Sequence, residues 1–162
     1  MIYNHWRDFA VGRQQLRNAR QRLVLTNGCF DLLHPGHLAL LEEARTLGDF
    51  LLVAINADSS IRSSKGPQRP VIPEMERAEL LSSMASVDGV VIFPEPTPIA
   101  MISTLLPEVL VKGADWGPGQ VVGEPEVLAA GGRVIRVRLQ TGYSTSGTIA
   151  RARTLPGSAI GR

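Results

Sequence analysis

The chain has 162 residues, of which 44% are apolar and 20% charged, with one cysteine and three histidines. This is an ordinary globular composition. It excludes a disulfide-stapled fold and a zinc site of the usual Cys/His spacing, and no window holds the roughly 18 apolar residues of a membrane span. The net charge of +2 hides a basic start (residues 1–22, +4), a basic end (151–162, +3) and an acidic body (23–150, −5). The start of the chain has no apolar stretch behind a basic region, so together with the lack of a span we expect a cytoplasmic protein without membrane contact. The uneven charge and the lack of a nucleic-acid-binding motif predict no nucleic-acid partner.

Residues 1–22 predict an N-terminal amphipathic helix. Its apolar stripe consists of Ile2, Trp6, Phe9 and Leu16. Exposed stripes of this kind usually mark a partner surface, and the basic charge of the segment would complement the acidic body of a second copy. We therefore predict a homodimer or higher homo-oligomer with this segment at the interface. The alternative is that the helix folds back on its own domain.

Short apolar runs alternate with helical patterns from residue 23 onward. The runs are Leu23–Thr26, Phe50–Asn56, Val87–Phe93, Val109–Lys112 and Arg133–Leu139. Candidate helices lie near residues 35–47, 74–85, 97–106 and 124–131, with a last one from about 144. This alternation is typical of βαβ units. It predicts an α/β fold with a Rossmann-like open parallel sheet of about five strands and helices on both faces, formed by residues 23–153 and followed by a flexible tail, 154–162.

Two longer connections, 57–73 and 113–123, follow predicted strands. In open α/β sheets, ligands bind beyond the carboxyl ends of the strands. Both connections are therefore candidate substrate loops, and a plain surface connection is the alternative.

The most informative stretch is residues 26–44, TNGCFDLLHPGHLALLEEA. After the first strand and a turn, His34-Pro35-Gly36-His37 stands at the start of the next helix. The N–H groups and dipole of a helix start favour an anion, and glycine allows the backbone to approach it closely. The two imidazoles can donate N–H bonds to phosphoryl oxygens as negative charge builds in a transition state. An HxGH motif in this context predicts a phosphate site, whereas a lone histidine pair would often be structural.

The motif resembles that of the cytidylyltransferase-like nucleotidyltransferases, which have a Rossmann-like fold. The resemblance covers about residues 23–150 and extends to Asn56-Ala57-Asp58, Lys65–Val71, Glu76-Arg77, Lys112–Trp116 and Tyr143–Ser146. Within this family, the GPxRPV loop and the VKGxD segment are most similar to the adenylyltransferase portion of bacterial ADP-heptose synthases. The resemblance implies that the adenylyl group of ATP passes to a sugar 1-phosphate, D-glycero-β-D-manno-heptose 1-phosphate. The products would be pyrophosphate and ADP-heptose for lipopolysaccharide or surface-polysaccharide synthesis.

The resemblance also implies roles for individual residues. His34 and His37 would be catalytic and hold phosphoryl oxygens as pyrophosphate leaves, and Lys65 would bridge the two anionic substrates. Nucleotide contacts are expected from Asn27, Gly28, Cys29, Phe30, Gly36, Lys112, Gly113, Ser144, Thr145 and Ser146. Contacts with the acceptor substrate are expected from Asp31, Asn56, Asp58, Arg69, Arg77, Asp115 and Trp116. Mg²⁺ is expected to arrive with ATP, without a dedicated set of protein ligands.

Several of these residues have simpler explanations. Asp31 could cap the turn, Arg77 could serve a structural ion pair, Lys65 could be a solvated loop residue, and a helix N-cap needs only one hydroxyl. Other functions also stay open. One is a CTP-dependent cytidylyltransferase acting on an alcohol phosphate such as glycerol 3-phosphate, against which the GPxRPV loop argues. Another is a nucleotide-sensing or tRNA-related module that has the fold without the chemistry, against which the presence of both motif histidines, Lys65 and the Ser144–Ser146 run argues.

Overall fold

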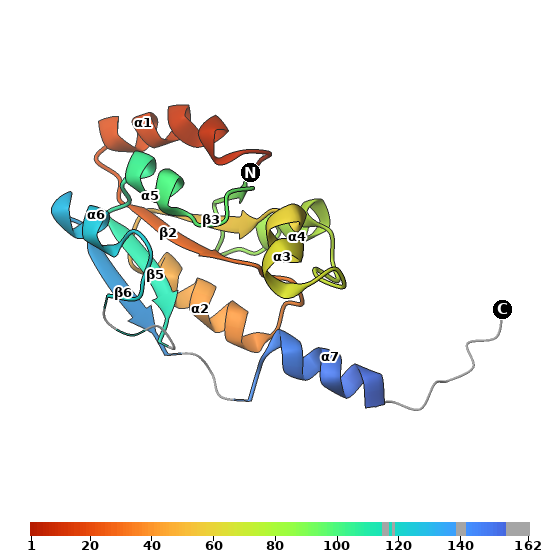
Figure 1. The fold of residues 1–162 in the computed structure, drawn as a ribbon. Helices are drawn as coiled ribbons and strands as arrows, with labels where there is room; N and C mark the ends of the chain where they lie inside the picture. The colour runs from red at the N-terminus through yellow and green to blue at the C-terminus, as the bar shows by residue number, and fades with distance from the viewer. Residues whose placement is uncertain (115–116, 118, 139–141, 155–162) are drawn as a thin grey trace.

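The computed structural model describes residues 1–114, 117, 119–138 and 142–154, and its strands form one six-stranded parallel sheet (Figure 1). The strand order is β1-β4-β3-β2-β5-β6. The bounds are β1 Ile2–Tyr3, β2 Leu23–Gly28, β3 Phe50–Asn56, β4 Gly89–Phe93, β5 Val109–Gly113 and β6 Arg133–Val137. The expected Rossmann-like α/β fold is confirmed, with one strand more than the five apolar runs predict.

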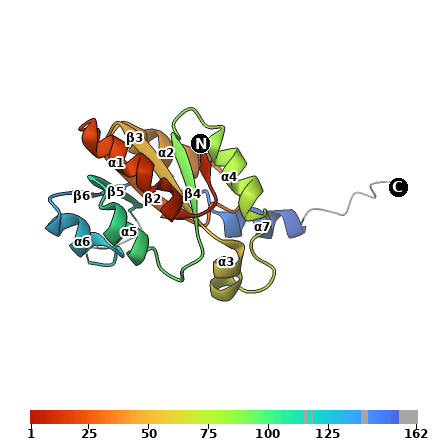
Figure 2. The same cartoon turned by 90° about the horizontal axis from the view of Figure 1, so that it is seen from above.

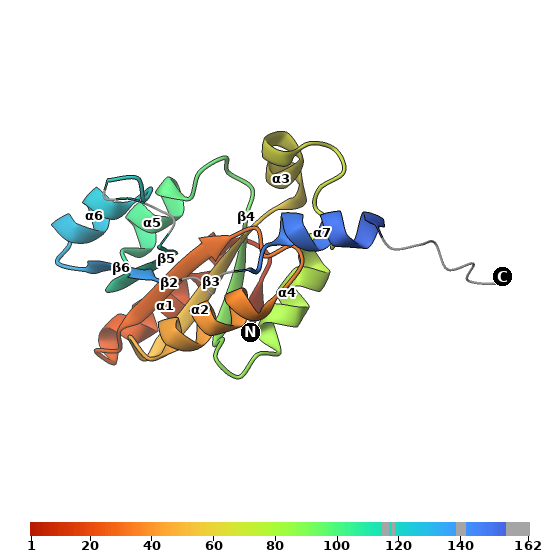
Figure 3. The same ribbon diagram turned by 90° about the horizontal axis from the view of Figure 1, so that it is seen from below.

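Helices cover both faces of the sheet. The helices α2 and α4 pack on one face, which Figure 3 shows from below, and α1, α5 and α6 pack on the other, which Figure 2 shows from above. The bounds are η1 Trp6–Phe9, α1 Ala10–Asn18, α2 Pro35–Arg45, α3 Asp58–Lys65, α4 Glu74–Ser82, α5 Ile99–Leu105, α6 Glu124–Ala129 and α7 Thr145–Thr154. In the described part of the chain, no helix is both long and apolar enough to cross a membrane.

The central strands are apolar on both faces because each face is covered by helices. Leu25 of β2 lies in register with Leu52 of β3 and Leu110 of β5, and this row faces the side of α1, α5 and α6. The neighbouring pair, Val24 and Leu51, faces the side of α2 and α4. Alternate side chains thus enter two separate cores, which explains why the strands appear in the sequence as uninterrupted apolar runs.

The order of the strands determines where a ligand can enter. From β2 the chain proceeds outward through β3 and β4 on one side, and then returns to place β5 and β6 on the other. The connection after β2 therefore leads toward β3 and the connection after β5 leads toward β6, in opposite directions from two adjacent strand ends. Such a switch point is the usual ligand crevice of an open α/β sheet.

The prediction of a single helix over residues 1–22 is wrong. The segment contains the edge strand β1, which pairs with β4, then the short 3₁₀ helix η1, and then α1. A capping box explains the break, because the His5 ring accepts a hydrogen bond from the Arg7 N–H and the Asp8 carboxylate accepts one from the His5 N–H. These bonds start a new helical segment at Trp6.

The apolar stripe of this segment packs inside its own protomer. Trp6, Phe9 and Leu16 are only 3%, 1% and 7% exposed, in the core beneath α5. The stripe is therefore not a partner surface. The prediction of a subunit interface at this segment depended on an exposed stripe. The oligomeric state stays a prediction without that support.

The connection 57–73 is not wholly a loop, because α3 forms its first half. Helix α3 is anchored at its start, where the Ala57 N–H donates to the Phe93 carbonyl and the Asp58 N–H donates to Glu74. One buried side chain, Ile61, fixes its inner face. The predicted tail from residue 154 begins on the last residue of α7, and its other residues lie outside the described part of the chain.

Candidate active site

The HxGH residues form the N-cap and the first turn of α2. His34 is the N-cap of α2, Pro35 occupies the first helical turn, and the His34 Nδ1 accepts a hydrogen bond from the His37 N–H at 3.3 Å. That bond requires an unprotonated Nδ1, so the proton of a neutral His34 ring lies on Nε2, where it can be donated. A Cβ at Gly36 would lie 3.1 Å from the His34 Nδ1, so a side chain at this position would press on the His34 ring.

The two imidazole rings stack on each other. The ring centroids of His34 and His37 are 3.7 Å apart, and Phe30 packs against His37 from another side at 5.1 Å. Burial lowers the pKa of His37 to about 4, with a further contribution from the charge of His34, and burial also lowers the pKa of His34. The His37 Nδ1 is buried and has no hydrogen-bond partner among the described residues. Both rings are therefore neutral donors at pH 7.

The low pKa of His37 predicts a dependence of stability on pH. The pKa is about 4 in the folded protein and 6.5 in an unfolded chain, so the unfolded state binds more protons between these values. The free energy of unfolding should fall as the pH decreases from 6.5 to 4, by about 2 kcal/mol from this residue, and this loss should level off below pH 4. Urea unfolding at several pH values, compared between wild type and His37→Gln, measures this contribution. Identical profiles for the two proteins would contradict the assignment.

A cavity of about 540 Å³ opens at the switch point of the sheet. Its walls come from the ends of β2, β3 and β5, from the turn before α2, from the last residue of α3 and from the segment after β4. The lining residues are Thr26, Asn27, Gly28, Cys29, Phe30, His37, Leu40, Asn56, Lys65, Pro96, Thr97, Pro98, Lys112, Gly113 and Val122. Nine of them are among the expected site residues, so the fold brings together motifs that are far apart in the sequence.

Two lysines contribute positive charge to this cavity. Lys112 is buried on β5, and its ammonium donates to the Asn27 carbonyl at 3.1 Å. Lys65 is exposed at the end of α3, and it also lines a second cavity, of about 320 Å³, between the segment after α3 and α7. The ammonium of Lys65 is thus placed at the boundary between two adjoining spaces.

Asp31 and Arg69 form an ion pair, and neither residue lines the main cavity. Asp31 is 1% exposed, and its carboxylate accepts from the Arg69 Nε at 2.6 Å and from the Val71 and Ile72 N–H groups at 2.8 and 3.0 Å. Burial alone would raise the pKa of Asp31, but the bonds from Ile72, Arg69 and Val71 outweigh it and hold the pKa below its ordinary value. This ion pair fastens the GPxRPV segment to the turn before α2.

Arg77 and Asp58 form a second buried pair. Arg77 is 0% exposed, and its Nη2 donates to Asp58 at 2.7 Å. Its remaining bonds go to backbone carbonyls, and neither residue lines the main cavity. The structure therefore gives Asp31, Arg69, Asp58 and Arg77 partners within the protein, and their contacts with a substrate stay predictions.

The hydroxyl run at the start of α7 lies against the histidine turn. The Thr145 hydroxyl donates to the Leu32 carbonyl at 3.2 Å, and the Tyr143 ring lies parallel to His34 at 6.3 Å. The Ser144 hydroxyl accepts from the Gly147 N–H as an N-cap does, and Ser146 lines the second cavity. Of the expected substrate residues, Asp115 and Trp116 lie outside the described residues.

Sequence reasoning missed part of the cavity wall. The additional lining residues are Thr26, Leu40, Pro96, Thr97, Pro98 and Val122. The sequence does carry a signal for Pro96–Pro98, because the proline-rich segment directly follows β4 and must therefore lie at the carboxyl edge of the sheet. Within the described part of the chain, no three His, Cys, Asp or Glu side chains gather in an arrangement that could hold a metal ion.

Comparisons with known proteins agree with this geometry. The cytidylyltransferase-like family model matches residues 25–153. The chain is similar to the bifunctional protein HldE of Azorhizobium caulinodans, with 53% identity over 133 residues, 82% of this chain and 28% of that protein. It is 55% identical over 130 residues to the bifunctional protein HldE of Rhodospirillum rubrum, which is 80% of this chain and 26% of that protein. The chain thus spans less than a third of the length of these relatives.

Two solved structures share the fold. A lipopolysaccharide core biosynthesis protein from Thermoplasma volcanium superposes with a TM-score of 0.61 and 28% identity, covering 76% of this chain and 99% of that one. Pantoate-beta-alanine ligase from Francisella tularensis superposes with a TM-score of 0.60 over 91% of this chain and 69% of that one. At 16% identity, the second likeness shows the fold alone.

Proposed function

The chain belongs to the cytidylyltransferase-like family, and from that premise we propose that it transfers the adenylyl group of ATP to a sugar 1-phosphate, D-glycero-β-D-manno-heptose 1-phosphate. One observation carries the proposal: a single cavity is lined by His37, by Lys65 and by the ends of β2 and β5. Identity of about half to parts of the HldE proteins supports the same reaction class. The setting would be the cytoplasm, where ATP is supplied.

The reaction is an in-line displacement at the α-phosphorus of ATP. An oxygen of the sugar phosphate forms the new bond to phosphorus while the bond to the bridging oxygen breaks, and pyrophosphate leaves with the bonding electrons. Because the attacking oxygen is already ionised, no strong base is required, and the protein must mainly position the reactants and neutralise charge. The neutral His34 and His37 rings would donate N–H bonds to the phosphoryl oxygens as charge moves to the leaving group.

Lys65 would hold the acceptor phosphate beside the α-phosphoryl group. Its place between the two cavities suits a cation that must contact both substrates, and a flexible ammonium can follow charge as it moves. The start of α7 would face the outer phosphates of ATP, since helix starts attract anions. Mg²⁺ would enter with the ATP phosphates, keep several water ligands and neutralise part of the pyrophosphate charge. The nearby carboxylates of Asp31 and Asp58 already have cationic partners.

A pyrophosphate-release assay tests the substrate class. Each of ATP, CTP, GTP and UTP is paired with heptose 1-phosphate, hexose 1-phosphates and glycerol 3-phosphate. We expect release above background with ATP and the heptose 1-phosphate, at least tenfold faster than with any other pair. Preference for CTP and glycerol 3-phosphate would overturn the proposed substrates in favour of the cytidylyltransferase alternative. No release from any pair would contradict enzymatic nucleotidyl transfer.

A further inference from the structure

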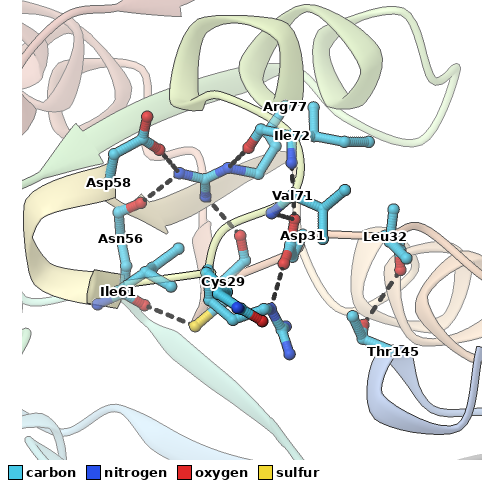
Figure 4. Close-up of polar contacts among 12 residues, drawn as sticks. Cys29, Asp31, Leu32, Asn56, Asp58, Ile61, Val71, Ile72, Arg77 and Thr145 are labelled. Atoms are coloured by element: carbon cyan, nitrogen blue, oxygen red, sulfur yellow. Dashed lines mark hydrogen bonds and ion pairs between the residues drawn. The ribbon is translucent and has the colours of Figure 1, made fainter. Parts of the chain in front are cut away.

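Arg77 is a fully buried cation that joins three segments of the site (Figure 4). From α4, its guanidinium donates to the Ile72 carbonyl at 2.9 Å, to the Cys29 carbonyl at 2.5 Å and to the Asn56 carbonyl at 2.9 Å. Asp58, at 2.7 Å, supplies the compensating charge. The three carbonyls belong to the turn after β2, the end of β3 and the segment before α4, so one side chain fixes their relative positions.

The bond to Cys29 acts on an unusual piece of backbone. Phe30, the next residue, has a φ of +47°, in the left-handed region that residues with a Cβ rarely adopt. Such a conformation persists only where the surrounding structure holds it. The Phe30 ring lies 5.1 Å from the His37 ring, so the conformation of Phe30 also affects the position of a predicted catalytic side chain.

The direction of this bond determines where the next N–H points. The peptide between Cys29 and Phe30 is trans, so its carbonyl oxygen and its N–H point in opposite directions. Both residues line the main cavity, whereas Arg77 is buried and does not. Holding the carbonyl toward Arg77 therefore turns the Phe30 N–H away from the buried arginine, and Phe30 itself belongs to the cavity wall.

We propose that Arg77 is a positioning residue for adenylyl transfer: by holding the Cys29 carbonyl, it aims the Phe30 N–H at the phosphoryl groups of the nucleotide. This inference rests on the proposed function. Lysine cannot replace the guanidinium, because a single ammonium lacks the planar fork that meets four acceptors on three segments. This role differs from the direct contact with the acceptor substrate that the sequence predicts for Arg77. Here the arginine does not touch the substrate and acts only through the backbone of Cys29 and Phe30.

The chain offers a matched control for this proposal. Arg13 is also a buried arginine held by backbone carbonyls and one carboxylate, but it lines neither of the two cavities at the site. It donates to Leu105 and Leu106 at 2.7 and 2.8 Å and to Glu108 at 2.6 Å. Arg13→Lys should therefore lower the unfolding midpoint without affecting the site, which separates loss of stability from loss of positioning.

The test compares Arg77→Lys and Arg13→Lys with wild type by two measurements. In the pyrophosphate-release assay, Arg77→Lys should lower kcat about 30- to 100-fold while the KM for ATP stays within about threefold, because an aimed donor acts mainly on the transition state. In an NMR titration without substrates, the pKa of the His37 ring should rise from about 4 toward 6.5, because a loosened turn lets water reach the ring. Arg13→Lys should leave both quantities unchanged.

The proposal is overturned if Arg77→Lys keeps kcat within threefold of Arg13→Lys. If wild type releases no pyrophosphate, the proposed function fails, and the His37 titration alone decides whether Arg77 positions the turn: an unchanged pKa overturns that role. If Arg77→Lys does not fold, Asp58→Asn replaces it in both measurements. That variant keeps an oxygen acceptor but removes the charge that holds the guanidinium, and it should show the same two changes in smaller size.

Discussion

Replacing either motif histidine with alanine should lower turnover by a factor of 10²–10³, far more than it weakens the binding of ATP. The reason is the geometry of the stack: the His34 Nδ1 is used by the His37 N–H, which leaves its Nε2 proton free for a phosphoryl oxygen. A donor placed where charge develops contributes about 3–4 kcal/mol to the transition state and less to the ground state. Steady-state kinetics for kcat, and calorimetry for ATP binding, measure the two effects separately.

Two further variants separate chemistry from folding. His34→Asn keeps an N-cap for α2, because asparagine caps helices well, yet it removes the imidazole. It should therefore lose turnover as His34→Ala does but retain more stability. His5→Ala removes the third histidine, which is the N-cap of η1 and takes no part in the stack of His34 on His37. Near-normal turnover in His34→Ala and His37→Ala, or an equal loss in His5→Ala, would refute the catalytic assignment.

The sequence predicts the sheet and the histidine turn well for physical reasons. The strands β2, β3 and β5 are buried on both faces, so their apolar runs are unbroken and easily located. The glycine and proline of HxGH restrict the backbone to one kind of turn at a helix start. Parallel topology then brings the strand ends to one edge, which is why residues as distant as Asn27 and Lys112 line the same cavity.

Other features depend on contacts that a single sequence does not display. Helix α3 contains four serines and one buried apolar residue, Ile61, so it has no apolar stripe to identify it. An arginine such as Arg77 is usually solvated or bound to an anion, and only the folded chain places four acceptors around it. The same holds for Asp31, whose partners on the GPxRPV segment lie about forty residues later in the chain.

Lys65→Ala should raise the KM for the sugar phosphate about threefold and lower kcat about 30-fold, since the two substrates would share one cation. Lys65 is the last residue of α3, and Gly66 follows it with a φ of +91°, which glycine adopts without strain. The segment beyond is fixed again by the Asp31 carboxylate at Arg69. Lys65 thus lies between two fixed parts of the chain, helix α3 and the Asp31–Arg69 ion pair. Its ammonium can approach a phosphate in either cavity. Losing a charge-assisted bond of about 2–3 kcal/mol corresponds to a factor of about 30–150 in rate.

Arg62→Ala is the matched control for Lys65. Arg62 is an exposed cation one turn earlier on the same helix, and it does not line either cavity. Its removal changes the net charge as Lys65→Ala does, so a general electrostatic effect would lower activity equally in both variants. Lys65→Arg should recover part of kcat, because it restores the charge but with a bulkier, planar group. If Lys65→Ala keeps wild-type KM and kcat, or if Arg62→Ala matches its loss, the bridge between the two substrates must come from another residue.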